Sequence, residues 1–147
     1  MSRIIEIAAA IVAETNNFKG WSQPLDAVRA YAPRYELKDL ADLKVTVVPK
    51  SLQGELATRR DFQTDYQFDV AVQKHLNVVD DEHVDAMLDL VQQMAAHWRF
   101  RGVQVDGVGA ICVKVSNEPV YSPDHLTQMQ VFTSVLTLTF RMVEGLS

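Results

Sequence analysis

The sequence predicts a single α+β domain over residues 1–147, with a mostly antiparallel sheet of about five strands and two helices packed on one face. Three observations support this prediction. Residues 130–143, QVFTSVLTLTFRMV, alternate between two faces for their whole length, which is the pattern of a long half-buried strand. Residues 62–76 alternate in the same way. Two other stretches, near residues 3–15 and 80–101, repeat apolar residues at the spacing of an amphipathic helix.

Length and composition are those of one globular domain. The chain has 147 residues, 48% of them apolar, and a domain of about 150 residues buries roughly 70% of its unfolded surface. The single cysteine, Cys112, excludes an internal disulfide and gives no indication of an oxidising compartment. No apolar run approaches the ~20 residues of a membrane helix. Glu6 interrupts the apolar N-terminal stretch, which favours an amphipathic helix there over a signal peptide.

Negative charge is concentrated in the second half of the chain. Residues 1–62 contain 9 Lys/Arg and 8 Asp/Glu, whereas residues 63–147 contain 5 and 11, so the net charge of −5 comes from the second part. A protein that clamps nucleic acid needs a basic surface to neutralise phosphates, and this balance argues against such a function. It suits a surface past which DNA moves without sticking.

The first half of the chain is predicted to contain a helix and three strands. The helix ends near Thr15, because turn-forming asparagines and a glycine follow. Strands are expected at 25–31 and 43–48, separated by a charged loop at 34–42 with one possible helical turn, and Pro49 is expected to end the second strand. The third strand, 62–76, has one apolar and one polar face, so only one side of the sheet is expected to carry helices.

The segment 50–61, KSLQGELATRRD, is predicted to be a long flexible loop at the tip of an extended β-hairpin arm. Loops of about 12 residues without structure of their own are uncommon and are often functional.

The second half is predicted to contain a helix and two strands, which gives the order α-β-β-β-α-β-β. Asp80 is placed to cap the helix, acidic residues occupy its first turn, and Gly102 is expected to stop it. A strand at 110–116 follows, then a proline-containing connection at 117–127, and finally the long strand at 130–143.

Two groups of side chains have the residue types of a reactive site. Asp81, His83 and Asp85 crowd the start of the second helix, but residues two apart on a helix diverge, so a solvated acidic turn is expected instead of a metal site. Ser122, Asp124 and His125 have the types of a nucleophilic triad.

The second group shares one loop, where Asp124 is expected to cap a turn. Cys112 lies in a predicted strand with apolar neighbours, so an inert buried thiol is expected. No catalytic residue, cofactor site or metal site is therefore predicted, and the sequence is not expected to encode an enzyme.

Three segments carry a resemblance to a known family: AVRAYAPRYELKDLADLKVTVVPK, DYQFDVAVQKHL and EPVYSPDHLTQMQVFTSVLTLTFR. They resemble small tail-completion or tail-terminator proteins of long-tailed bacteriophages and prophages. The resemblance extends from about Val28 to Arg141, and its most specific parts are DLKVTVVPK and PVYSPDHL with FTSVLTLTFR.

The resemblance implies a structural function in head–tail joining. Proteins of this family are similar to α+β domains that assemble as rings, usually hexameric, where the tail tube meets the head–tail connector. For this chain it implies a place in the neck or tail of the virion after assembly in the host cytoplasm. The implied partners are other copies of the chain, the tail-tube protein and the connector or adaptor proteins. DNA would pass through the ring without sequence-specific binding, and neither a cofactor nor a membrane is implied.

The family has no motif that assigns contacts to individual residues, so the contact residues are hypotheses based on the predicted strands. The loop is assigned to contacts with an adjacent ring through Leu52, Gln53, Glu55, Arg59 and Arg60. The polar faces of the two long strands are assigned to the subunit interface or the lumen: Gln67, Asp69, Gln73, Thr133, Thr137 and Thr139. The motivation is the length of these strands and their alternation, which is expected to leave the polar face exposed, because exposed strands join neighbouring chains.

Other functions stay open at this point. One is a head-completion or stopper protein on the connector side of the same machine. Another is a small soluble ligand-binding or enzymatic α+β domain that uses the His125 loop or a cleft beside Trp98. The third is a general interaction module of the host.

Overall fold

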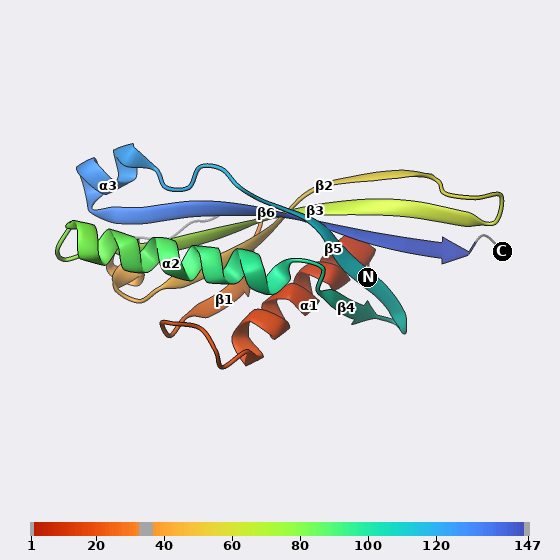
Figure 1. Ribbon diagram of the computed structural model, residues 1–147, viewed down its shortest axis with the longest axis horizontal. Coiled ribbons are helices and arrows are strands. Elements are labelled where there is room, and N and C mark those ends of the chain that lie inside the picture. Colours follow the sequence, from red (N-terminus) through yellow and green to blue (C-terminus); the bar gives the residue numbers. More distant parts are fainter. Residues whose placement is uncertain (1, 33–36, 146–147) are drawn as a thin grey trace.

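The chain folds as a six-stranded sheet with long helices on one face, in a computed structural model that describes residues 2–32 and 37–145. The strands, in spatial order, are β1 (Asp26–Arg29), β2 (Lys44–Leu56), β3 (Asp61–His75), β6 (Val131–Gly145), β5 (Val108–Asn117) and β4 (Gly102–Val105). Two long helices, α1 (Arg3–Asn17) and α2 (Asp81–Trp98), lie on the same side of the long strands (Figure 1). The predicted α+β class with two helices on one face is confirmed.

The sheet is mostly antiparallel, as predicted, because every neighbouring pair except β1–β2 runs in opposite directions. The parallel exception follows from the chain path. The connection from β1 to β2 includes a short 3-10 helix, η1 (Leu37–Ala41), and returns the chain to the same end of the sheet. The predicted helical turn lies in η1, while residues 33–36 of that loop lie outside the described residues.

The core lies between the two long helices and one face of the sheet. α1 contributes Ile7 and Ile11, and α2 contributes Met87, Leu90 and Trp98, all of them fully buried. The helix-side face of the long strands supplies the aromatic and aliphatic residues that the alternation predicted: Phe68, Val70, Val72, Leu136, Leu138 and Phe140. Burying each large apolar side chain stabilises the fold by about 1.5–3 kcal/mol.

The beginning of α2 is as predicted and its end is not. The Asp80 carboxylate accepts a hydrogen bond from the His83 amide at 2.9 Å, which is a side-chain N-cap. The helix ends at Trp98, because Phe100 adopts a left-handed backbone conformation with φ of 60°. The reversal therefore occurs at Phe100, and Gly102 begins β4 instead of stopping the helix.

Pro49 does not end β2, contrary to the prediction. The strand continues to Leu56 and pairs with β3 beyond a bulge between Pro49 and Ser51. A proline is tolerated here because a bulge on an edge strand does not need its amide hydrogen. The predicted flexible loop at 50–61 is therefore mostly regular hairpin, and only residues 57–60 form the turn.

Two short elements were missed by the sequence prediction. β4 pairs with β5 across a turn at Asp106 and Gly107, both in the left-handed region. A third helix, α3 (Pro123–Met129), lies within the predicted connection at 117–127. α3 is on the opposite side of β6 from α2 (Figure 1), so the prediction that only one side of the sheet carries helices is wrong at this end.

Candidate functional site: the projecting arm

The most prominent feature outside the core is a three-stranded arm, formed by residues 50–65 of the β2–β3 hairpin and residues 141–145 of β6. The arm projects beyond α1 and α2 (Figure 1). Residues 50–60 are all exposed. The long hairpin predicted from the sequence is therefore present, and β6 strengthens it along one side.

The polar face of the arm is held by contacts across all three strands. Asp65 lies opposite both Gln53 and Arg141 in the strand register. The Arg141 guanidinium donates from Nε to Asp65 Oδ1 at 2.9 Å and from Nη2 to Oδ2 at 3.1 Å. These hydrogen bonds raise the pKa of Arg141 above its ordinary value. Nearer the core, Ser51 Oγ donates to Gln67 Oε1 at 2.8 Å. These contacts support a regular, well-paired arm.

On the helix-side face of the arm, the β2–β3 hairpin carries exposed apolar side chains, while Glu144 of β6 lies beside them opposite Phe62. Leu52, Leu56 and Phe62 share this face, because Leu52 lies opposite the core residue Tyr66 and Leu56 lies opposite Phe62. Their exposed fractions are 60%, 65% and 37%. Gly54 lies between the two leucines, and a Cβ there would come within 2.5 Å of the Phe62 ring, so the glycine lets that ring lie flat on the arm. Contiguous exposed apolar patches are more typical of interaction surfaces than of the rest of a protein surface.

The start of α1 contacts the β6 side of the arm but leaves the hairpin side free. The Arg3 guanidinium pairs with Glu144 at 3.3 Å and with Asp106 at 2.8 Å. These contacts fix the start of α1 against β6 and the β4–β5 turn. The β2–β3 hairpin extends beyond the two long helices (Figure 1), and its Leu52 and Leu56 side chains are exposed.

The outer edge of the arm is open. β1 pairs with β2 only from Lys44 to Val47, and Ala30 adds one further hydrogen bond to Val47. Within the described part of the chain, no strand pairs with the outer edge of β2 from residue 50 to residue 56. Unpaired backbone groups along a strand edge are a template for another chain.

The tip of the arm carries two adjacent cations. Thr58 closes the turn, since its amide donates to Asp61 O at 3.2 Å and its hydroxyl accepts from the Asp61 amide at 3.0 Å. Arg59 and Arg60 are exposed in this turn, and neither forms an ion pair with another described residue. All five residues predicted for ring contact therefore lie in the arm, with Leu52 on its apolar face and Gln53 and Glu55 on its polar face.

The residues predicted for the subunit interface or lumen share one face of the sheet, but they differ in exposure. Gln67, Asp69 and Thr137 are half-buried. Gln73, Thr133 and Thr139 are buried within the single chain, so the expectation that their face is exposed is wrong for them. At the start of β6 the cover comes from α3, where His125 Nδ1 lies 2.9 Å from Thr133 Oγ1. Alternation shows which residues share a face of a strand, but it does not show whether another element covers the polar face.

The Ser122, Asp124 and His125 group forms the first turn of α3. Ser122 Oγ accepts a weak hydrogen bond from the His125 amide at 3.4 Å, so the N-cap is Ser122 and not Asp124 as predicted. The His125 ring is directed to Thr133, and no hydrogen bond joins it to the Ser122 hydroxyl among the described residues.

The other residues considered for chemistry lie in structural positions. Cys112 is buried as predicted, and desolvation raises its pKa to about 11, well above that of a reactive thiol. Trp98 is fully buried, with its ring packed on Phe140, so its side chain is not open to solvent as the expected cleft would require. His83 Nδ1 lies 2.6 Å from Asp80 Oδ1 at the helix cap. Across residues 2–32 and 37–145, no three metal-ligating side chains converge.

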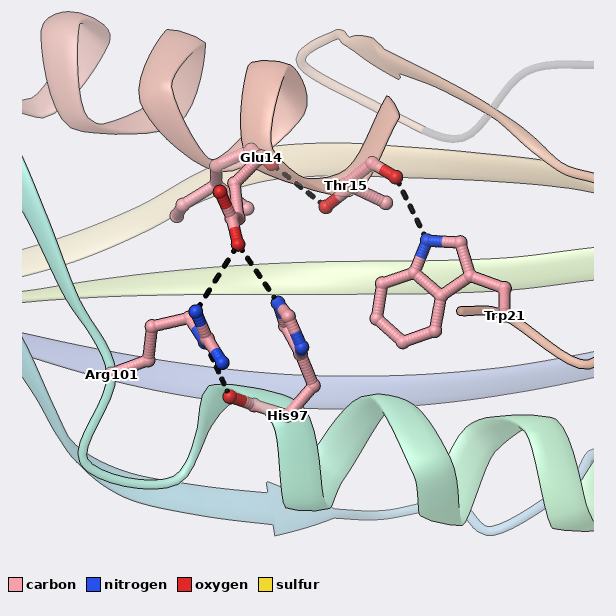
Figure 2. Close-up of polar contacts among 6 residues, drawn as sticks. Glu14, Thr15, Trp21, His97 and Arg101 are labelled. Atoms are coloured by element: carbon pink, nitrogen blue, oxygen red, sulfur yellow. Dashed lines mark hydrogen bonds and ion pairs between the residues drawn. The ribbon is translucent and has the colours of Figure 1, made fainter. Parts of the chain in front are cut away.

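A second polar cluster joins the ends of α1 and α2. Figure 2 shows Glu14 between His97 and Arg101: Glu14 Oε1 lies 3.1 Å from His97 Nε2 and 3.4 Å from Arg101 Nη1. Trp21 Nε1 donates to Thr15 O at 2.8 Å, and the Phe18 and Trp21 rings pack on His97 with centroids 4.4 and 4.9 Å away. Glu14 therefore links the end of α1 to the end of α2 and to Arg101, which is a structural contact between the helices.

Comparisons with known proteins add evidence on the fold alone. No protein-family model matches the chain, and no curated protein is similar to it. The fold is similar to that of a solved protein whose description names no activity, with a TM-score of 0.55 and 14% sequence identity over 97% of this chain and 96% of that one. At this identity the similarity supports the architecture and carries nothing about activity. None of the described helices has the length and apolar composition required to cross a membrane.

Proposed function

We propose that this protein is a structural component of a bacteriophage neck that forms a ring, expected to be hexameric, caps the tail tube and joins it to the head–tail connector. The observation that carries the proposal is the arm. Three strands leave the helix-covered core, expose an apolar strip and keep an open edge, and these are properties of a surface that binds other protein chains.

The segments that resemble tail-completion proteins support the same function. DLKVTVVPK overlaps the beginning of β2, DYQFDVAVQKHL overlaps β3, and the final segment includes α3 and most of β6. These elements form the centre of the sheet and the base of the arm. The segments that carry the resemblance therefore belong to the strands that continue into the arm.

The charge distribution is consistent with a ring through which DNA passes. The net charge is −5, and all of it comes from residues 63–147, which have 5 Lys/Arg and 11 Asp/Glu. A lumen of this character repels phosphates weakly and leaves DNA mobile. In this proposal the arm contacts neighbouring chains, while the polar outer face, with Gln67, Asp69 and Thr137, lies at the subunit interface or in the lumen.

The test is a nonsense mutation in this gene, in the phage or prophage that encodes it. The expected result is filled heads that are not joined to tails, together with tails of irregular length, in electron micrographs. A plasmid copy of the native gene should restore joined particles. Normal virions without the protein would contradict the proposal. Tails of normal length beside heads that lose DNA would instead indicate the stopper function on the connector side.

A further inference from the structure

The arm presents a combination of apolar and basic groups at one end of the molecule. Leu52 and Leu56 are exposed along its helix-side face, and Arg59 and Arg60 are exposed in the turn that follows. Leaving this strip in water is unfavourable at about 25 cal/mol per Å² of apolar surface. A partner for this surface must therefore offer apolar contact and, next to it, negative charge.

The beginning of α2 offers both. Val78 and Val79, directly before the helix, are 51% and 40% exposed. The solvent side of the helix then carries exposed acidic residues: Asp81, Glu82, Asp85 and Asp89. No Lys or Arg occurs in the sequence between Lys74 and Arg99, so the residues of this helix itself include no permanent positive charge. This surface complements the arm in two ways: its exposed valines match the leucines, and its negative charge matches the arginines.

The two surfaces lie at opposite ends of the molecule. β3 connects them, with the tip of the arm before Asp61 and the entry to α2 after His75 (Figure 1). A 15-residue strand spans roughly 45–50 Å. The arm is regularly paired along this direction and points away from α2, so it cannot fold back onto its own helix. Only another chain can bring the two surfaces together.

We propose that the arm of one copy docks on the N-terminal half of α2 of a second copy, with Leu52 and Leu56 against Val78 and Val79 and with Arg59 and Arg60 on the acidic row. Because the two surfaces differ, the contact is head to tail and propagates until it closes into a ring or continues as a chain. The inference deepens the proposed ring and rests on that proposal for self-association, but it requires no function in a phage.

The experiment is a charge swap with two variants that leave the core intact. The tip variant is Arg59→Asp with Arg60→Asp, and the helix variant is Asp85→Lys with Asp89→Lys, which spares the first turn and the cap. Lys19→Glu, at an exposed position outside both surfaces, is the control. Circular dichroism and thermal unfolding establish that each variant is folded, and sedimentation velocity measures assembly.

The native chain and the Lys19→Glu control should assemble, while each double variant alone should remain monomeric because like charges then meet at the contact. An equimolar mixture of the two variants should assemble again, since each reversed surface finds its complement. Assembly of the native chain should weaken as salt is added, because exposed charges are screened. Leu56→Ser should also reduce assembly without changing the fold, since this side chain is 65% exposed.

Three results would overturn the inference: a native chain that stays monomeric up to its solubility limit, a double variant that assembles alone like the native chain, or a mixture that stays monomeric. Failure of this contact and failure of the proposed function can be told apart. Variants that still form rings and join tails would remove this contact and keep the function. A charge swap that controls assembly of a protein dispensable for virions would keep the contact and remove the function.

Discussion

The Arg141 guanidinium and the Asp65 carboxylate form a two-point contact across adjacent strands of the arm, with Nε–Oδ1 at 2.9 Å and Nη2–Oδ2 at 3.1 Å. Arg141 belongs to β6 and Asp65 to β3, and the two lie directly opposite in the strand register. The planar match of guanidinium and carboxylate fixes orientation as well as distance. This contact ties the hairpin to β6 at the place where the helical layer ends.

The first prediction concerns the order of the arm. Asp65→Asn removes the charge-assisted contact, so amides of residues 50–65 should exchange hydrogen several-fold faster while the core amides keep their rates. Hydrogen exchange measured by mass spectrometry checks this. Gln53→Ala, on the same face, is the matched control and should leave the arm unchanged. Equal exchange in the Asp65→Asn variant and the native chain would mean that backbone pairing alone orders the arm.

The second prediction concerns the core. Trp98 is fully buried, and its ring packs on Phe140 with centroids 5.8 Å apart. Trp98→Ala should lower the free energy of unfolding by about 3–5 kcal/mol, since large-to-small changes leave a cavity. Chemical denaturation measures this loss.

Trp98→Phe is the matched variant for that experiment. The Trp98 Nε1 is buried without a hydrogen-bond partner among the described residues, so its removal costs no hydrogen bond there. Trp98→Phe should therefore cost clearly less than Trp98→Ala. Equal losses from the two variants would contradict the packing described here.

The third prediction concerns pH. The His97 side chain is only 5% exposed, and burial, followed by the nearby Arg101, lowers its pKa from 6.5, although Glu14 acts in the opposite direction. The folded protein therefore favours neutral His97, and the unfolded chain takes up a proton more readily. This contribution to stability is complete above pH 6.5 and is lost as the pH falls through the folded pKa.

The measurement is the melting temperature between about pH 8 and about pH 5, which should fall toward the acid side. His97→Gln should flatten that dependence, because an amide does not titrate in this range. His75→Gln, at the end of β3, is the control and should retain the native slope. A native slope in the His97→Gln variant would show that other groups cause the acid sensitivity.

The fourth prediction concerns the joint between α1 and β1. The Asn16 side chain accepts from the Ala27 amide at 2.8 Å and donates to Ala27 O at 2.9 Å. These two hydrogen bonds join the end of α1 to the backbone of β1. Asn16→Ala should destabilise the protein by about 1–2 kcal/mol, the loss of two hydrogen bonds. Asn17→Ala, at the exposed neighbouring position, should have little effect in the same denaturation experiment. If both alanine variants are equally stable, Asn16 does not hold this joint.

The sequence patterns predicted those strands and helices in which buried residues recur at a constant spacing. β3 and β6 were predicted within two residues at each end, because Tyr66, Phe68 and Val70 and their partners on β6 repeat every second residue. The cap at Asp80 was predicted because a side-chain cap needs only local sequence. The same local logic failed at Pro49, where a bulge accommodates the proline, and at Ser122, where two residues compete for one cap.

The sequence alone determined the class of fold, the long strands and the presence of two cations near the tip of a hairpin, since each depends on residues close together in the chain. The tertiary structure alone decided which polar residues are covered, that Leu52, Leu56 and Phe62 share one uncovered face, and that this face lies at the opposite end from the acidic helix. These depend on strand register and on where the helical layer stops. Both are set by packing between distant segments, which periodicity within one segment does not encode.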